Sequence, residues 1–130
     1  MKTIIAGSRN IVEYKALLDA IEASGFEITE VVSGGARGVD ALGERYANEK
    51  GIPLKIFPAD WESYGRKAGI MRNTEMAHYA DALIAVWDGS SPGTLNMINQ
   101  AQSRGLKVYT LKVRVSQDLK ENSEAPWNKD

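Results

Sequence analysis

The sequence lacks cysteine altogether, so neither a disulfide framework nor a thiolate metal site holds the fold together. Its single histidine, His78, has no neighbours that would complete a metal set or a serine-type triad. The sequence thus predicts no metal site and indicates no cofactor. The absence of cysteine is typical of a cytoplasmic protein, which is the location we expect.

An excess of charge of one sign is also missing, because 16 lysines and arginines stand against 17 aspartates and glutamates. Broad attraction to nucleic acid or to an anionic membrane is therefore not indicated, and any anion must be bound by a local cluster. Long hydrophobic runs are missing too. The apolar run at residues 3–6 is far too short for a signal peptide or a membrane span, so we expect no membrane partner.

What the sequence does contain is enough apolar material for one domain. A chain of 130 residues, of which 43% are hydrophobic, fills a single core and leaves little room for a second domain. From residue 114 onward the chain is polar. We predict one ligand-binding domain over residues 1–113 and a polar tail over residues 114–130, in which Trp127 is the residue able to dock.

Five short apolar runs, each bounded by turn residues, predict strands that are buried on both faces of a parallel sheet. They cover residues 3–6, 28–32, 54–57, 82–87 and 107–111. Apolar residues at helical spacing lie between these runs. They predict helices that begin near Tyr14, Val39 and Leu95 and end at Gly25, Gly51 and Gly105, with a further helix over residues 66–79.

The alternation of strands and helices predicts an α/β fold, because right-handed crossovers place the strands in one parallel sheet with helices on both faces. We predict a Rossmann-like three-layer sandwich with a five-stranded parallel sheet in the order 3-2-1-4-5. This order puts a topological switch point between strands one and four, where open sheets generally bind ligands. The loops that follow the strands should then meet at one edge.

The first of three glycine-rich loops is Gly7-Ser8-Arg9, after the first strand. Glycine permits close approach of a ligand to the backbone, and serine and arginine can donate hydrogen bonds to an anion. The same residues also suit a plain turn in which Ser8 caps the next helix.

The second loop, residues 33–40 with the sequence SGGARGVD, is the strongest local signal. Its glycines let successive amides form an anion-binding nest at the start of the next helix, and its arginine adds charge. The alternative is a tight turn whose glycines serve close packing of helix and strand. The pattern is neither the nicotinamide-type GxGxxG nor a P-loop. The candidate ligand-binding residues here are Gly34, Gly35, Ala36, Arg37, Gly38 and Asp40.

The third loop, residues 88–94 with the sequence DGSSPGT, offers another anion cradle, with Thr94 placed to cap the following helix. An ordinary capped loop is the alternative. The candidate residues are Asp88, Gly89, Ser90, Gly93 and Thr94.

The segment over residues 60–73 joins aromatic faces to positive charge. A base can stack on Trp61 or Tyr64 while Arg72, next to Asn73, contacts a ribose or a phosphate. An exposed helix with basic side chains lying along its surface would give a similar pattern. Trp61, Arg72 and Asn73 complete the set of candidate ligand-binding residues.

Taken in order, these motifs resemble those of the SLOG superfamily, which includes the DNA-processing protein A group and the Lonely-guy group. The loop at residues 33–40 resembles the phosphate loop of the superfamily, and further motifs within residues 2–111 resemble the YspA, cpYpsA-related SLOG branch. The resemblance implies a Rossmann-like fold, a nucleotide-type ligand and pairing into a homodimer or higher homo-oligomer. The motifs are Gly7-Ser8-Arg9, Phe57-Pro58-Ala59-Asp60-Trp61, Ala68-Gly69, Arg72-Asn73, Glu75-Met76, Ala80-Asp81 and Gly93-Thr94.

The resemblance also bears on catalysis. Lonely-guy enzymes cleave the bond between a base and ribose monophosphate with an arginine before the fourth strand, which Arg72 matches, and a glutamate in a PGGxGTxxE motif. Here Trp87 and Asp88 stand where Pro-Gly would begin, and Met97 occupies the glutamate position. Methionine neither stabilises an oxocarbenium-like centre nor activates water, so that mechanism does not carry over intact. Arg72 and Asp88, or Asp40 in its place, are the remaining catalytic candidates.

Three functions therefore stay open. The first is binding or sensing of a nucleotide, nucleotide-sugar or related phosphate-bearing ligand, with Arg9, Arg37 and Arg72 as charge partners. The second is a nucleotide N-glycosidase or phosphoribohydrolase with a non-standard acid. The third is binding of single-stranded DNA by gripping of its phosphates, which the overall charge balance favours less.

Overall fold

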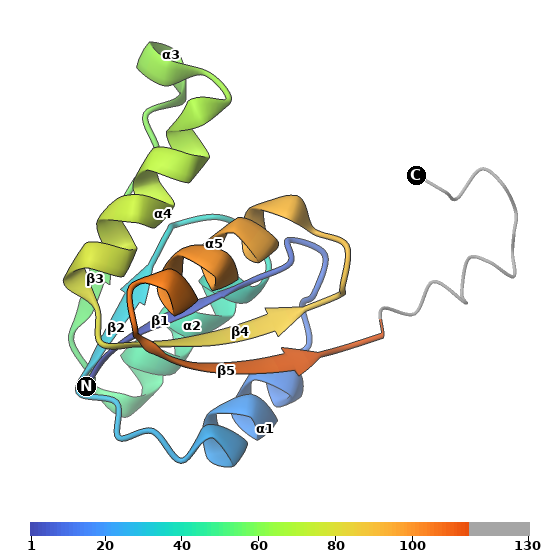
Figure 1. Ribbon diagram of the computed structural model, residues 1–130. Helices are drawn as coiled ribbons and strands as arrows, with labels where there is room; N and C mark the ends of the chain where they lie inside the picture. Colours follow the sequence, from blue (N-terminus) through green and yellow to red (C-terminus); the bar gives the residue numbers. More distant parts are fainter. Residues whose placement is uncertain (115–130) are drawn as a thin grey trace, which may run out of the picture.

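The computed structural model describes residues 1–114, which form a five-stranded parallel sheet covered by helices on both faces (Figure 1). The strand order is β3-β2-β1-β4-β5, which confirms the predicted order and fold class. The strands are β1 (Lys2–Gly7), β2 (Glu30–Ser33), β3 (Leu54–Ile56), β4 (Ala82–Trp87) and β5 (Lys107–Lys112). The helices are α1 (Tyr14–Ser24), α2 (Val39–Lys50), α3 (Trp61–Tyr64), α4 (Lys67–Tyr79) and α5 (Pro92–Ser103). Residues 115–130, with Trp127, lie outside the described part of the chain.

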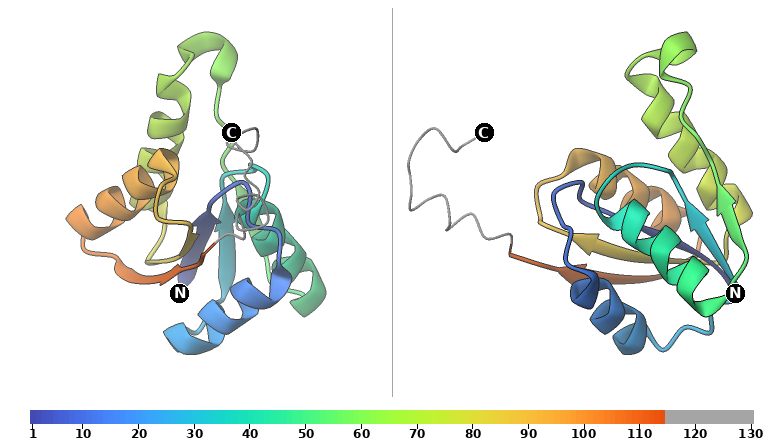
Figure 2. Two further views of the ribbon diagram at one scale, coloured as in Figure 1. Left: turned by 90° about the vertical axis from the view of Figure 1, so that its right-hand side faces the viewer. Right: turned by 180° about the vertical axis from the view of Figure 1, so that it is seen from behind.

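Alternate residues of the central strands enter two separate cores on opposite faces of the sheet. Ile4 and Leu83 pack with residues of α4 and α5, whereas Ile5 and Ile84 pack with residues of α1 and α2. The register of β1 and β4 pairs Ile4 with Leu83 and Ile5 with Ile84, so each core receives an aligned apolar pair. This burial on both faces explains why the two strands are continuous apolar runs, and Figure 2 shows the resulting three layers.

The prediction that all five strands are buried on both faces is wrong for β3 and β5. Each pairs with a single neighbour, and both contain exposed residues along their length. Lys55 on β3 and Lys107 on β5 are exposed. Lysines on an edge strand discourage pairing with another chain, so their position suits the two ends of the sheet.

Helix α5 begins earlier than predicted, which changes the role of Thr94. Pro92 is its first residue, where a missing N–H costs nothing, and Ser91 is the N-cap. Thr94 is therefore inside the first turn and is not the cap. Its hydroxyl oxygen lies 3.2 Å from the hydroxyl oxygen of Ser91.

Helix α3 was not predicted, although the sequence carries a signal for it. The side chain of Asp60 accepts a hydrogen bond from the amide of Ser63 at 3.1 Å, which is the usual capping geometry for a helix start. Helix α3 and the first turns of α4 project away from the sheet (Figures 1 and 2). Among residues 1–114, no helix combines the length and apolar character needed to cross a bilayer.

Candidate functional site

Ser8 holds the three glycine-rich loops together at the carboxyl edge of the sheet. Its carbonyl oxygen accepts a hydrogen bond from the amide of Val39 at 3.3 Å, which ties the loop after β1 to the start of α2. Its hydroxyl oxygen accepts a hydrogen bond from the amide of Asp88 at 3.0 Å, which ties the same loop to the one after β4. Ser8 is only 1% exposed, and α1 has Glu13, not Ser8, at its N-cap. The loops therefore meet as the topology predicts, and Ser8 is their junction.

Two glycines in these loops are required by backbone contacts. A Cβ at Gly7 would overlap the carbonyl oxygen of Val86, and one at Gly38 would overlap the carbonyl oxygen of Ser8. Gly38 also has a φ of 73°, a backbone conformation that residues other than glycine rarely adopt. Close packing of the loops accounts for glycine at these two positions.

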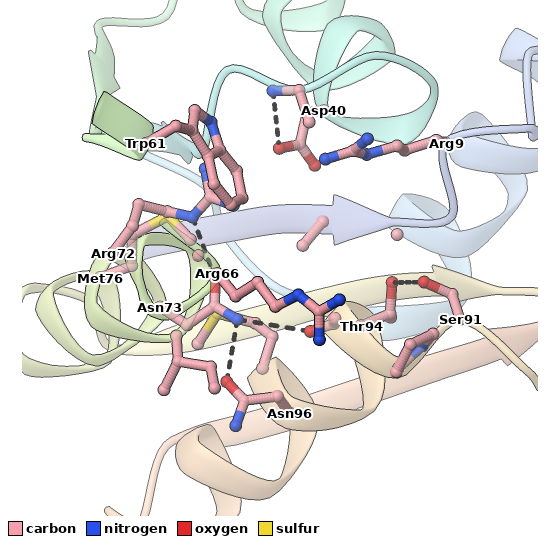
Figure 3. A pocket seen from close by; sticks show the side chains of 18 residues that line it. Arg9, Asp40, Trp61, Arg66, Arg72, Asn73, Met76, Ser91, Thr94 and Asn96 are labelled. Atoms are coloured by element: carbon pink, nitrogen blue, oxygen red, sulfur yellow. Dashed lines mark hydrogen bonds between the residues drawn. The ribbon is translucent and has the colours of Figure 1, made fainter. Parts of the chain in front are cut away.

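A cavity of about 290 Å³ lies between these loops and helices α4 and α5, and we call it the arginine cavity (Figure 3). Arg9 reaches it from the loop after β1, Arg66 from the position just before α4, and Arg72 from α4 itself. Among residues 1–114, Asp40 is the only one with a carboxylate that lines it. The cavity wall thus carries more positive than negative charge, and it is bordered by Trp61.

A second cavity of about 410 Å³ adjoins the first, and we call it the glycine-loop cavity. Gly34, Gly35 and Arg37 line it on the side of the loop after β2. Pro58 and Ala59 line it on the side of the segment after β3. The residues that border both cavities are Arg9, Ala36, Trp61 and Arg72.

Arg72 lies at the boundary between the two cavities, half-buried on α4. Its guanidinium group donates one hydrogen bond to the carbonyl oxygen of Gly34 and another to the side-chain oxygen of Asn73 at 3.2 Å. Burial lowers the pKa of Arg72, and the nearby Asp40 carboxylate opposes that effect. An arginine keeps its charge in either case, so Arg72 supplies a fixed cation with its donors oriented by two contacts.

Asp40 is the acidic residue that faces this cation. It is 6% exposed, and its Oδ2 accepts a hydrogen bond from the amide of Ala36 at 3.1 Å. Burial raises the pKa of Asp40 to about 6, against the lowering effects of the Ala36 amide, Arg72 and Arg9. Neither arginine forms an ion pair with Asp40 among the contacts within residues 1–114.

Asn73 links the cavity to the interface between α4 and α5. It is buried, and its amide nitrogen donates to the carbonyl oxygen of Gly93 at 3.3 Å and to the side-chain oxygen of Asn96 at 3.0 Å. Its own side-chain oxygen accepts from Arg72, so a single amide orients the arginine and fixes the start of α5. The side-chain oxygen of Asn96 also accepts from Gln100 at 3.0 Å, which extends the network along α5.

The amide nest predicted for the loop over residues 33–40 is partly taken up by the protein itself. The amide of Gly35 donates to the hydroxyl oxygen of Ser33 at 3.1 Å, and the amide of Ala36 donates to Asp40. The amide of Val39 donates to Ser8. These three donors hold the loop in shape, so arginine side chains, more than loop amides, are the donors that face the cavities.

The cradle predicted for the loop after β4 is likewise occupied. Oδ1 of Asp88 accepts hydrogen bonds from the amides of Ser90 and Ser91, each at 2.9 Å. Burial alone would raise the pKa of Asp88, but these two amides, together with the hydroxyls of Ser8 and Ser90, outweigh it and hold the pKa below its usual value. Asp88 therefore stays ionised and closes its own loop, which makes it a poor proton donor.

The predicted site residues fall into three groups. The arginine cavity is lined by Gly7, Arg9, Ala36, Asp40, Trp61, Arg72, Asn73, Gly93 and Thr94. The glycine-loop cavity adds Gly34, Gly35 and Arg37. Neither cavity is lined by Ser8, Gly38, Asp88, Gly89 or Ser90.

Sequence reasoning missed several residues of α4 that line the arginine cavity. Arg66, Gly69, Asn73 and Met76 follow one another at helical spacing, so they share one face of the helix, but of these only Asn73 was predicted to bind the ligand. The spacing within the predicted helix over residues 66–79 carries this signal. The sequence does not show which face of that helix is directed toward the glycine-rich loops, so the face that lines the cavity was not identified.

Met97, at the position of the Lonely-guy glutamate, is 1% exposed and lines the arginine cavity with an apolar side chain. Helix α5 therefore brings no acid to this site. Within residues 1–114, no three histidine, aspartate or glutamate residues are grouped so that they could hold a metal ion.

These features define the class of protein: a Rossmann-like α/β domain with an arginine-lined cavity at the carboxyl edge of its sheet. The model of the YspA, cpYpsA-related SLOG family matches residues 1–64. The chain is 36% identical to the Gene 61 protein of Mycobacterium phage D29, and the match covers 82% of this chain and 93% of that protein. The chain belongs to the YspA, cpYpsA-related SLOG family.

The fold is also similar to that of DNA processing protein A (DprA) from Streptococcus pneumoniae. The two structures superpose with a TM-score of 0.71 at 18% sequence identity. The likeness covers 92% of this chain and 53% of the DprA chain, so this chain spans about half the length of that protein.

Proposed function

We propose that this chain binds a nucleotide, a nucleotide-sugar or a related phosphate-bearing ligand in the arginine cavity. The observation that carries the proposal is the convergence of Arg9, Arg66 and Arg72 on one cavity bordered by an aromatic ring. Guanidinium groups match phosphate oxygens in charge and in geometry, since each offers several donors in a fixed plane. Three of them from two segments of the chain form a local anion site in a protein whose net charge is only −1.

The arginines near the cavities are available for a ligand. Within residues 1–114, the arginine side chains that donate hydrogen bonds to other residues are Arg45, Arg72 and Arg104. Arg9 and Arg66 therefore extend into the arginine cavity without a partner in the described part of the chain, as Figure 3 shows. Unpaired guanidinium groups around a cavity favour binding of an anion there.

Trp61 supplies the apolar surface that a base requires. Its side chain is 50% exposed, although it borders both cavities and its ring packs over Gly69. A large aromatic ring left half-exposed beside cationic side chains suits stacking of a planar heterocycle. The pairing of this ring with the arginines favours a nucleotide over inorganic phosphate.

Isothermal titration calorimetry of the full chain against ribonucleoside mono-, di- and triphosphates tests this proposal. We expect at least one of them to bind, and Arg72→Ala to weaken that binding at least tenfold. Arg45→Ala is the matched control, because Arg45 pairs with Glu49 on the exposed side of α2 and lines neither cavity. Absence of binding, or equal losses in the two variants, would contradict the proposal.

Binding of single-stranded DNA is a second candidate, favoured by the aromatic residues of α3. Trp61 and Tyr64 are both 50% exposed on the projecting segment, next to Arg66 and Lys67. Exposed aromatic rings flanked by basic residues are typical of proteins that bind unpaired bases by stacking. A labelled oligonucleotide should then bind with an affinity that falls steeply with salt and that Tyr64→Ala reduces. Tyr64 lines neither cavity, so Tyr64→Ala should leave nucleotide binding unchanged.

A further inference from the structure

The arginine cavity contains a buried carboxylate, which would repel an anionic ligand. Asp40 is 6% exposed and, in the part of the chain that the structure describes, has the only carboxylate that lines the arginine cavity. A phosphate group next to it would be repelled, and burial of an ionised group without an ion-pair partner destabilises the fold. The carboxylate should therefore meet a part of the ligand other than its phosphate.

One oxygen of this carboxylate is left free to bind that part. Oδ2 accepts the hydrogen bond from the amide of Ala36, and no residue within 1–114 donates a hydrogen bond to Oδ1. A buried acceptor without a donor is uncommon in folded proteins, and it costs free energy that a ligand hydroxyl would recover. Oδ1 thus marks a place where the cavity lacks a hydrogen-bond donor.

Asp40 lies between the aromatic ring and one of the arginines of the arginine cavity. In Figure 3, Trp61, Asp40 and Arg9 follow one another along one side of the cavity, and Arg66 and Thr94 lie on the other. A nucleotide consists of a base, a sugar and a phosphate in that order. With the base on Trp61 and the phosphate toward Arg9, the sugar is the part that lies beside Asp40, and its hydroxyl groups are neutral donors.

We infer that Asp40 accepts hydrogen bonds from the hydroxyl groups of a ribose, so that the arginine cavity selects ribonucleotides over 2′-deoxyribonucleotides. The inference rests on the proposed function, whose ligand class it narrows. Carboxylates serve this purpose well because two cis hydroxyl groups match their two oxygens, and a deoxyribose leaves the buried acceptor without a partner. Loss of one hydroxyl then costs far more than the loss of one contact at an exposed site.

The N–H groups on the edge of guanine offer a pair of donors similar to that of a ribose. The two sources give different results, because a guanine edge would make binding depend on the base and not on the sugar. We assign the contact to the sugar, because a base stacked on Trp61 with its phosphate toward Arg9 would leave the sugar nearest to Asp40.

Calorimetry of the full chain with AMP, GMP, CMP and UMP, each paired with its 2′-deoxy counterpart, tests the inference, with inorganic phosphate as a sugar-free probe. For the ribonucleotides that bind, we expect an affinity at least tenfold higher than that of the deoxy partner. In Asp40→Asn this ratio should fall below about threefold, which is well under the tenfold step that corresponds to 1.4 kcal/mol. The variant should bind inorganic phosphate at least as tightly as the wild type does. This result would show that the site is still folded in the variant.

Several outcomes would overturn the inference. Equal affinity for ribo and deoxy partners in the wild type would do so, as would a ratio that persists in Asp40→Asn. Tight binding of GMP and of its deoxy partner alike, lost in Asp40→Asn, would assign the contact to guanine instead. If inorganic phosphate binds and no nucleotide does, the inference fails while the arginine cavity remains an anion site. If none of the probes binds the wild type, the proposed function itself fails.

Discussion

The guanidinium group of Arg72 donates a hydrogen bond to the carbonyl oxygen of Gly34 at 2.5 Å, which joins α4 to the loop after β2 across 38 positions of the sequence. The two residues also fit each other sterically. A Cβ at Gly34 would lie 2.6 Å from a terminal nitrogen of Arg72 and 3.0 Å from Oδ2 of Asp40. The absence of a side chain at Gly34 therefore makes room for the arginine and the aspartate of the candidate site.

We predict that Gly34→Ala displaces the Arg72 side chain. The end of the arginine can move away from the added methyl group but then loses its hydrogen bond to Gly34, so the free energy of unfolding should fall by about 0.5–1.5 kcal/mol and nucleotide binding should weaken at least tenfold. Urea denaturation and calorimetry measure the two effects. Gly93→Ala is the matched control for stability, because a Cβ there meets no atom within 4 Å and alanine favours the helix by up to about 1 kcal/mol. A Gly34→Ala protein as stable as the wild type would contradict the contact described.

Asp40 should give the protein an unusual pH dependence. Its pKa of about 6 in the folded state lies above its value of 3.8 in the unfolded chain, so the folded state binds the proton more tightly. The stability contributed by Asp40 is complete below pH 4 and is lost as the pH rises to 6. Asp40→Asn should therefore be the more stable protein above pH 6, by at most about 3 kcal/mol, and this advantage should disappear toward pH 4. Chemical denaturation over this pH range measures the difference, and a difference independent of pH would contradict the assignment.

Asp88 should show the opposite sign. Its pKa in the folded state lies below the ordinary value because the amides of Ser90 and Ser91 bind the ionised form more strongly than burial disfavours it. The stability it contributes is therefore present above pH 4 and is lost on acidification. Asp88→Asn should be less stable than the wild type at pH 7 by about 0.5–1.5 kcal/mol, and the two proteins should converge as the pH falls below 4. A constant difference across that range would show that the charge of Asp88 is not what stabilises the loop.

Trp61 should report ligand binding through its fluorescence. Its indole is half-exposed at the cavity, whereas the indole N–H of Trp87 already donates to the carbonyl oxygen of Ser91 at 3.1 Å. A nucleotide that stacks on Trp61 should change the emission of the wild type and of Trp87→Phe, but not that of Trp61→Phe. An unchanged response in Trp61→Phe would place the base elsewhere.

The fold was predictable because its signals are local. Residues 4–6 and 82–87 are apolar throughout, as is typical of strands buried on two faces, and Gly25 and Gly51 end their helices with φ values of 69° and 67°. The chirality of the connections then limited the strand order to a few arrangements, of which 3-2-1-4-5 was the one predicted. The edge strands were harder to predict, because a strand with one neighbour need not be apolar.

The site was only partly predictable, because its contacts join distant positions. Glycine-rich loops marked where the site would form, but the sequence does not show that Ser33, Asp40 and Asp88 use the loop amides for themselves. Nor does it show that Arg72 is placed by Gly34. The sequence also does not show that Arg66 reaches the cavity, because this depends on how α3 and α4 project from the sheet.

Arg9, Ala36, Trp61 and Arg72 border both cavities, so the two spaces share one electrostatic environment. A small anion held in one space reduces the positive potential felt in the other, and two separate small anions should bind with negative cooperativity. A single elongated molecule with two anionic groups escapes part of this penalty, because its second group arrives at a high effective concentration once the first is bound. The shared wall should thus make the affinity for an anionic ligand depend on the length of the ligand as well as on its charge.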